Sequence, residues 1–225
     1  MTEVVSIVGD GAQAARAALE RTIAGGGVVL FPADGLYGLA CDPLDAAAIA
    51  RIHKIKGRDD GKPSAVMYLS PLAMRELIEG LGPRTRDAVG ALLPGPLTLV
   101  VANQQGRYPL ACREDPARLG VRLIGGPLAG AMYPLFQTSA NHSGEPATGS
   151  FEGVPAEIVE AVDLAIDGGE LTGQPSSVLD LTAFDESGEW WVLREGAVGR
   201  AELEERLAGL ALAAQPESGG SDSST

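Results

Sequence analysis

The sequence predicts a mixed α/β (α+β) fold with one central β-sheet flanked by helices. Short apolar runs rich in Val, Ile and Leu are interspersed with segments of helical periodicity along the whole chain. Most of these runs are continuous rather than alternating, which favours a sheet covered on part of both faces. A chain of 225 residues that is 45% hydrophobic can bury a sizeable core without disulfides or metals.

Capping and breaking residues define the expected elements of the first third of the chain. Asp10 is an N-cap candidate for a helix over residues 12–24, which the three glycines at 25–27 would end. Asp45 is the corresponding candidate for a helix over residues 46–56. Strands are expected at residues 28–32 and 64–70, with a loop over residues 34–43.

The remaining elements follow from the same patterns. Helices are expected at 71–82, 84–94 and 201–214, and strands at 98–102, 120–124, 177–182 and 190–194, with a turn at 184–189. Residues 125–136 fit neither period. The chain ends in the polar stretch QPESGGSDSST, so we expect one domain over residues 1–211 and a disordered tail over 212–225.

The charge and the cysteine content limit the classes of partner. A net charge of -13 argues against a general nucleic-acid-binding protein but leaves room for a local basic pocket. The two cysteines and two histidines form no zinc-binding pattern, so no protein-held metal is expected. The N-terminus lacks the features of a signal peptide, and no apolar run approaches the ~20 residues that span a bilayer. We therefore expect a cytoplasmic protein that does not enter a membrane.

The stretch KIKGRDDGKPS, residues 54–64, contains all three lysines of the chain, Lys54, Lys56 and Lys62, together with Arg58. It is not a P-loop, because the spacing is one residue short, a proline replaces the Ser/Thr, and the stretch follows a helix. Two interpretations remain. The cations could be a solvated helix end, or they could converge on a polyphosphate or a carboxylate.

Three further features have both an architectural and a functional interpretation. FPADGLYGLACDP, residues 31–43, is either a tight turn or a loop whose glycines let a ligand approach the backbone. TSANHSGEPAT, residues 138–148, is either a polar loop or a set of hydrogen-bonding groups for a nucleotide. Arg122 lies within an apolar run and Arg194 ends another, and a buried arginine must be paired or must face an anion.

In this order, the segments resemble the YrdC/Sua5 family, the threonylcarbamoyl-AMP synthases of tRNA modification. The motifs that carry the resemblance are FPADGLYGLACDP, KIKGRDDGKPS, LLPGPLTLVV, LGVRLI, TSANHSGEPAT, SSVLDLT and VLREGAV. The resemblance covers about residues 10–205, and we expect the chain to lack the additional C-terminal domain of the longer Sua5 members. It implies a single YrdC-like domain in which a twisted mixed sheet and its helices enclose a positively lined cavity.

The resemblance also implies a reaction. L-threonine, bicarbonate and ATP, with Mg²⁺, would form threonylcarbamoyl-AMP and pyrophosphate for the N6-threonylcarbamoyladenosine modification at position 37 of tRNA. A downstream tRNA threonylcarbamoyl transferase complex would use the product, and the chain itself would bind tRNA weakly or not at all. The implied catalytic residues are Lys56 and Arg58. The implied substrate- and nucleotide-binding residues are Asp34, Gly35, Tyr37, Lys62, Arg122, Ser139, Ala140, Asn141, Ser143, Ser177 and Arg194.

Several positions depart from the family pattern. Ala33-Asp34-Gly35 stands where the family usually has Thr-Asp/Glu-Thr, Asp59 follows the Lys-x-Arg motif in place of proline, and Met67 replaces a histidine found in some members. The second threonine contacts substrate in the family, so the nucleotide half of the site is better supported than the threonine half. Two alternatives stay open: a divergent paralogue that makes or uses another carbamoyl adenylate, and a non-catalytic RNA-binding or regulatory module.

Overall fold

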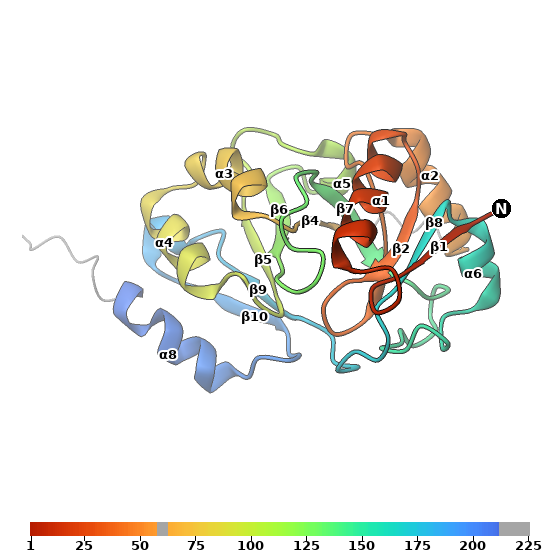
Figure 1. Cartoon of the computed structure of the whole chain (residues 1–225). Coiled ribbons are helices and arrows are strands. Elements are labelled where there is room, and N and C mark those ends of the chain that lie inside the picture. Colours follow the sequence, from red (N-terminus) through yellow and green to blue (C-terminus); the bar gives the residue numbers. More distant parts are fainter. Residues whose placement is uncertain (58–62, 212–225) are drawn as a thin grey trace, which may run out of the picture.

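The structure is a computed structural model that describes residues 1–57 and 63–211 (Figure 1). Within these residues one sheet of ten strands forms the centre of the molecule. The strands are β1 (Glu3–Ser6), β2 (Val29–Pro32), β3 (Tyr37–Cys41), β4 (Ala65–Tyr68), β5 (Leu97–Ala102), β6 (Arg118–Leu123), β7 (Leu135–Ser139), β8 (Leu164–Asp167), β9 (Ser177–Asp180) and β10 (Trp191–Arg194). The helices are α1 (Ala12–Ala24), α2 (Ala46–Ile55), α3 (Pro71–Glu79), α4 (Pro83–Leu92), α5 (Pro109–Cys112), α6 (Ala156–Ala161), α7 (Phe184–Ser187) and α8 (Arg200–Ala211).

The sheet is mixed and its strand order is β1-β8-β2-β3-β7-β4-β6-β5-β9-β10. Four pairs are parallel, namely β1–β8, β2–β8, β4–β6 and β5–β9, and the other pairs are antiparallel. Because β8 lies near one edge and β9 near the other, the chain between them must cross most of the sheet. Figure 1 shows this connection along the lower edge of the molecule. The predicted fold class, a mixed sheet flanked by helices, is confirmed.

Strand alternation separates two buried clusters on opposite faces of the sheet. In β4, Val66 and Tyr68 belong to the larger cluster and Met67 belongs to the smaller one. The larger cluster takes apolar side chains from α2, α3, α4 and α8, whereas the smaller cluster is covered by α1. One face is therefore covered along its length, and the other is covered mainly over the half of the sheet that contains β1, β8, β2 and β3.

The open half of the second face is visible in the burial of β5 and β6. Leu97, Leu99 and Val101 are fully buried in the larger cluster, while Thr98 and Val100, between them, are only partly buried. On β6 the residues facing the same open side are Arg118, Gly120 and Arg122. This part of the sheet is the floor of a cavity, described below.

The two predicted helix caps have different outcomes. Asp45 is the N-cap of α2, where its carboxylate accepts hydrogen bonds from the backbone N–H groups of Ala47 and Ala48 at 2.9 and 3.0 Å. The prediction for Asp10 is wrong. Gly11 is the N-cap of α1, with no side-chain cap, and Asp10 Oδ2 instead accepts from the backbone N–H of Ser6 at 2.8 Å. The Asp10 carboxylate therefore stabilises the turn between β1 and α1 and does not cap the helix.

The loop predicted over residues 34–43 is also wrong, because its middle part is β3. Residues 37–41 pair with β2 on one side and with β7 on the other, and all five are buried. Residues 33–36 connect the two strands of this β-hairpin, with Ala33 N–H donating to Leu36 O at 2.9 Å. Strands β1, β7 and β8 had not been predicted. For these three strands and for β3, a pairing partner is distant in sequence or the apolar run is very short.

Some predictions fall on residues that the structure does not describe. Arg58 and Lys62 lie in the interval 58–62, and the expected tail lies beyond residue 211. Among the described residues no helix combines the length and the apolarity needed to cross a membrane. The two cysteines, Cys41 and Cys112, are both buried and unpaired.

Candidate functional site

A cavity of about 530 Å³ lies on the open half of the sheet. Its walls come from the β2–β3 turn, strands β4, β5, β6, β7, β9 and β10, and the segment just before β9. The structure brings together residues that are up to 161 positions apart, from Ala33 to Arg194. The predicted site residues that line it are Gly35, Tyr37, Arg122, Ser139 and Arg194.

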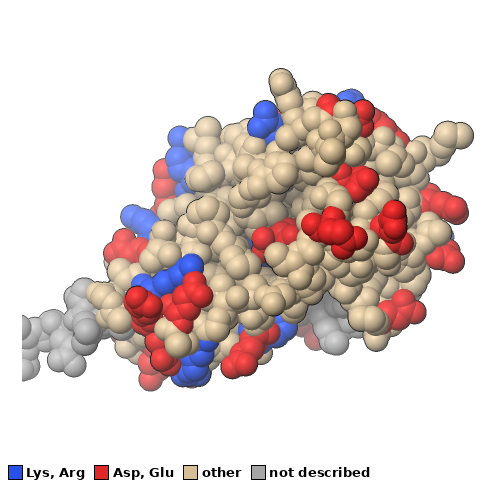
Figure 2. Space-filling model, turned by 60° about the horizontal axis from the view of Figure 1, so that its bottom comes forward, with Lys and Arg blue, Asp and Glu red and all other residues tan. Residues whose placement is uncertain are grey.

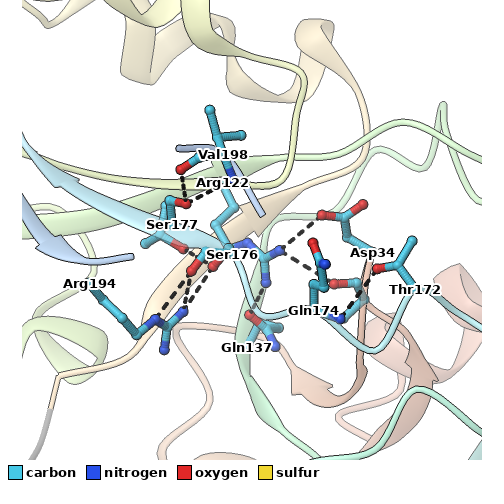
Figure 3. A network of polar contacts seen from close by, with 11 residues as sticks. Asp34, Arg122, Gln137, Thr172, Gln174, Ser176, Ser177, Arg194 and Val198 are labelled. Atoms are coloured by element: carbon cyan, nitrogen blue, oxygen red, sulfur yellow. Dashed lines mark hydrogen bonds and ion pairs between the residues drawn. The ribbon is translucent and has the colours of Figure 1, made fainter. Parts of the chain in front are cut away.

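Arg122 is the most buried cation of this cavity. Only 7% of its surface is exposed, and its guanidinium lies between Asp34 and Gln137 (Figure 3). Nη1 donates to Gln137 Oε1 at 3.0 Å, and Nη2 donates weakly to Ala33 O at 3.4 Å. Nη2 is 3.8 Å from Asp34 Oδ2, and Nε has no hydrogen-bond partner. A buried guanidinium with a distant carboxylate and an unused donor is suited to an anionic ligand.

Burial shifts both members of this loose ion pair. Desolvation lowers the pKa of Arg122 to about 10; the charge of Arg194 also lowers it, while the Asp34 carboxylate raises it. Desolvation likewise raises the pKa of Asp34, and the Arg122 charge opposes this shift. With a pKa of about 10, Arg122 carries its charge at pH 7. The cavity therefore keeps a permanent cation whose burial is only partly compensated by Asp34.

Two further arginines approach the same cavity. Arg118 pairs with Asp180 and lies 3.7 Å from a carboxylate oxygen of Asp115, yet its Nε is buried without a partner. Arg194 donates from Nη2 to the backbone oxygen of Ser176 at 2.8 Å and to its hydroxyl at 3.1 Å (Figure 3). Among the described residues that line the cavity, three are arginines and one, Asp115, is acidic.

Lys56 lies beside the cavity and is enclosed by the loop at residues 139–143. Its Nζ donates to the backbone oxygens of Ser139 and Asn141 and, at 3.3 Å, to Asn141 Oδ1. Its own backbone oxygen accepts from the N–H of Ser143 at 3.0 Å. Only 3% of Lys56 is exposed, and it does not line the cavity. In this structure Lys56 fixes the loop that carries Ser139, while Ala140 is fully buried behind it.

Two predicted binding residues have their hydroxyl groups engaged within the protein. Tyr37 Oη donates to Gly169 O and accepts from the N–H of Gly168, both at 2.9 Å. Ser177 is fully buried, and its Oγ donates to Val198 O at 2.7 Å and accepts from Val198 N–H at 3.0 Å. The serine that faces the cavity is its neighbour Ser176, because side chains alternate along β9.

The Asp34-Gly35 turn is shaped by what packs against it. Asp34 has a φ of 82°, which is unfavourable for a residue with a side chain and is typical of constrained functional sites. At Gly35 the constraint is space. A Cβ there would lie 2.1 Å from the backbone oxygen of Gln174 and 2.8 Å from Thr172 Oγ1. The structure thus explains why the threonine of the family pattern is absent from this position.

Replacing Gly35 with alanine is expected to lower the free energy of unfolding by about 1–3 kcal/mol, because the new methyl group must displace backbone rather than a flexible side chain. Urea unfolding would measure the change. Gly125→Ala is the matched control, since nothing lies within 4 Å of a Cβ at that position. Equal stability of the two variants would show that residues 172–174 do not pack against the turn as described.

The sequence interpretation missed several residues of the cavity. They are Asp115, Arg118, Gln137, Gln174 and Ser176. Strand alternation could have indicated Arg118 and Gln137, which lie four and two positions before the predicted Arg122 and Ser139. Gln174 had no local signal, because its position depends on the path of the chain across the sheet. Met67, singled out as a departure, is fully buried in the cluster beneath α1 and does not line the cavity.

Fold and cavity together define the class: a single mixed α/β sheet protein with an arginine-rich cavity for an anionic ligand. Comparisons with known proteins identify the family. The Sua5/YciO/YrdC family model, described as "Telomere recombination", matches residues 21–196. A threonylcarbamoyl-AMP synthase from Nitrosococcus oceani is 32% identical over 168 residues, which are 71% of this chain and 89% of that protein. The chain belongs to the Sua5/YciO/YrdC family.

Solved structures agree with this assignment. Sua5 from P. abyssi complexed with L-threonine superposes with a TM-score of 0.75 at 27% identity, covering 92% of this chain. The chain spans 60% of the length of that protein. E. coli YciO shares the fold, with a TM-score of 0.75, 24% identity and coverage of 90% of this chain and 100% of YciO. The resemblance predicted from the motifs is confirmed.

Proposed function

We propose that this chain is an L-threonylcarbamoyl-AMP synthase that joins L-threonine, bicarbonate and ATP and releases pyrophosphate. The observation that carries the proposal is the arginine-rich cavity built from the family motifs. Arg122 is buried there with an unused donor, and Arg118 and Arg194 approach the same space. The curated relatives bearing this name and the threonine complex of P. abyssi Sua5 support threonine and ATP as substrates, and bicarbonate is part of the proposal.

The proposed chemistry requires two anions to meet. The amine of threonine adds to the carbon of bicarbonate and water is lost, which gives a carbamate; a carbamate oxygen then attacks the α-phosphorus of ATP while the bond to pyrophosphate breaks. Arg118, Arg122 and Arg194 reduce the repulsion between carbamate, carboxylate and phosphates and hold them in position. ATP enters as its Mg²⁺ complex, in which the metal ion neutralises part of the phosphate charge. Arg58 and Lys62, from the stretch KIKGRDDGKPS, add two further cations.

The loop at residues 139–143 is the proposed nucleotide-side wall. Lys56 anchors this loop from behind through its hydrogen bonds to Ser139 and Asn141. Ser139 lines the cavity, and Asn141 and Ser143 follow it at the surface. We therefore assign Lys56 a positioning role and keep Ser139, Asn141 and Ser143 as nucleotide-binding candidates.

The chemistry of the proposed product, threonylcarbamoyl-AMP, indicates which kind of enzyme must use it. A carbamoyl adenylate is a reactive mixed anhydride, so an acceptor enzyme must take it up promptly, and we propose a tRNA threonylcarbamoyl transferase complex in the cytoplasm. Acidic side chains are spread over the face seen in Figure 2, and the whole chain has a net charge of -13. We expect direct tRNA affinity to be weak and strongly reduced by salt.

Pyrophosphate release tests the proposed function. The protein is incubated with Mg²⁺–ATP and bicarbonate, with L-threonine or with other amino acids, and released pyrophosphate is measured. Release that requires both bicarbonate and threonine is the expected result. ATP-dependent release with another amine, but not with threonine, would assign the chain to a different carbamoyl adenylate. Failure to bind ATP at all would favour a non-catalytic module.

A further inference from the structure

Residues 171–176, here called the crossing segment, form one wall of the cavity. They are the last part of the connection that takes the chain from β8 to β9 across the sheet (Figure 1). The segment packs so closely that glycines in three other parts of the chain have no room for a methyl group. A Cβ at Gly35, Gly149 or Gly196 would lie 2.1, 2.9 or 2.4 Å from its backbone.

Backbone hydrogen bonds attach the crossing segment at both ends. The N–H of Leu171 donates to Gly149 O at 2.8 Å, and the N–H of Gly173 donates to Gly35 O at 2.9 Å. Near β10, the N–H of Ala197 donates to the backbone oxygen of Pro175 at 2.9 Å. Arg194, itself a cavity residue, donates to the backbone oxygen of Ser176. The segment is therefore a fixed part of the site rather than a loose surface loop.

Gln174 presents a side chain from this wall to the cavity. Gln174 is exposed and lines the cavity, and within the described residues its side-chain amide makes no hydrogen bond. Figure 3 shows it between Arg122 and Thr172, next to Asp34. Its backbone occupies the space beside Gly35, which has no side chain. At this end of the cavity the Gln137 amide already accepts from Arg122 through its Oε1, whereas the Gln174 amide is not engaged in this way and can bind a ligand.

We infer that Gln174 is a specificity-determining residue, whose amide hydrogen-bonds the hydroxyl of the amino-acid substrate held beside Arg122. This inference rests on the proposed function. The cation at Arg122 holds the carboxylate of the substrate, which brings its side chain toward the wall formed by the crossing segment. A side-chain amide both donates and accepts, so it matches a hydroxyl and gains nothing from a methyl group of the same size.

The test compares threonine with valine, which has a methyl group in place of the hydroxyl. In Gln174→Ala, the ratio of kcat/KM for threonine to that for valine is expected to fall about tenfold, the size of one hydrogen bond. The affinity for Mg²⁺–ATP should stay unchanged. Gln174→Met keeps the length of the side chain without the amide and should give the same fall. Gln104→Ala removes an exposed glutamine that does not line the cavity and should leave the ratio unchanged.

The outcomes separate this inference from the proposed function. An unchanged threonine-to-valine ratio in Gln174→Ala, with threonine-dependent release intact, overturns the role of Gln174 alone. A fall in Gln174→Ala but not in Gln174→Met shows a steric effect and overturns the hydrogen bond. No threonine-dependent release by the unsubstituted protein overturns the proposed function, and the inference with it.

Discussion

Replacing Arg122 with methionine is expected to lower kcat/KM for threonine-dependent pyrophosphate release by about 100-fold or more. The guanidinium is the most buried cation of the cavity and keeps an unused Nε donor. Methionine fills a similar volume without charge, so the loss would come from the missing cation rather than from a cavity. Initial rates at varied threonine and ATP concentrations would show which substrate depends on it.

The same substitution is expected to leave the free energy of unfolding within about 1 kcal/mol of the original. A buried charge with one carboxylate at 3.8 Å carries a desolvation cost that an apolar side chain avoids. Against this gain, Asp34 loses the charge that lowers its pKa, so its carboxylate becomes easier to protonate. Loss of activity with retained stability is the signature of a residue kept for binding.

Arg75→Met is the matched control for Arg122→Met. Arg75 lies on α3, with 65% of its side chain exposed and a carboxylate oxygen of Glu79 3.9 Å away, and should change neither activity nor stability. Activity of Arg122→Met within a few-fold of the original would contradict the assignment of the cavity as the reaction site.

The sequence allowed prediction of site residues that are unusual for their local context, such as a charged residue within an apolar strand. Arg122 was identified because a charge inside an apolar strand needs an anionic partner, and the structure places it in the cavity. Ser177 was named as a binding residue, but its side chain is buried in the core, and the preceding residue, Ser176, lines the cavity instead. Such an error follows from strand register, which depends on pairing partners far away in sequence.

The missed parts of the fold share one physical cause. β3 was predicted as a loop because Gly38 and the Asp34-Gly35 turn dominate its local composition. Its strand conformation comes from pairing with β2 and β7. The crossing segment likewise has no local period, and its place in the site comes from the strand order, which separates β8 from β9. Long-range pairing therefore decides where Gln174 lies.

Replacing Lys56 with methionine is expected to impair both stability and activity, unlike the Arg122 substitution. Lys56 Nζ bonds to the backbone oxygens of Ser139 and Asn141, and 3% of the residue is exposed. Removing the ammonium leaves two part-buried carbonyl groups without this donor, at a cost of roughly 3 kcal/mol in unfolding free energy. The loop at residues 139–143 loses its anchor, so kcat/KM for ATP should fall by about 100-fold.

Lys54→Met provides the matched control, because Lys54 lies in the last turn of α2, two residues before the C-cap Lys56, and is exposed. It should leave both urea unfolding and ATP-dependent turnover unchanged. A Lys56→Met protein with normal stability but no turnover would show that the ammonium acts on substrate phosphates rather than on the loop. A protein with normal stability and normal turnover would remove Lys56 from the site altogether. The predicted pairing of lost stability with weaker ATP use is what distinguishes a positioning residue from a catalytic one.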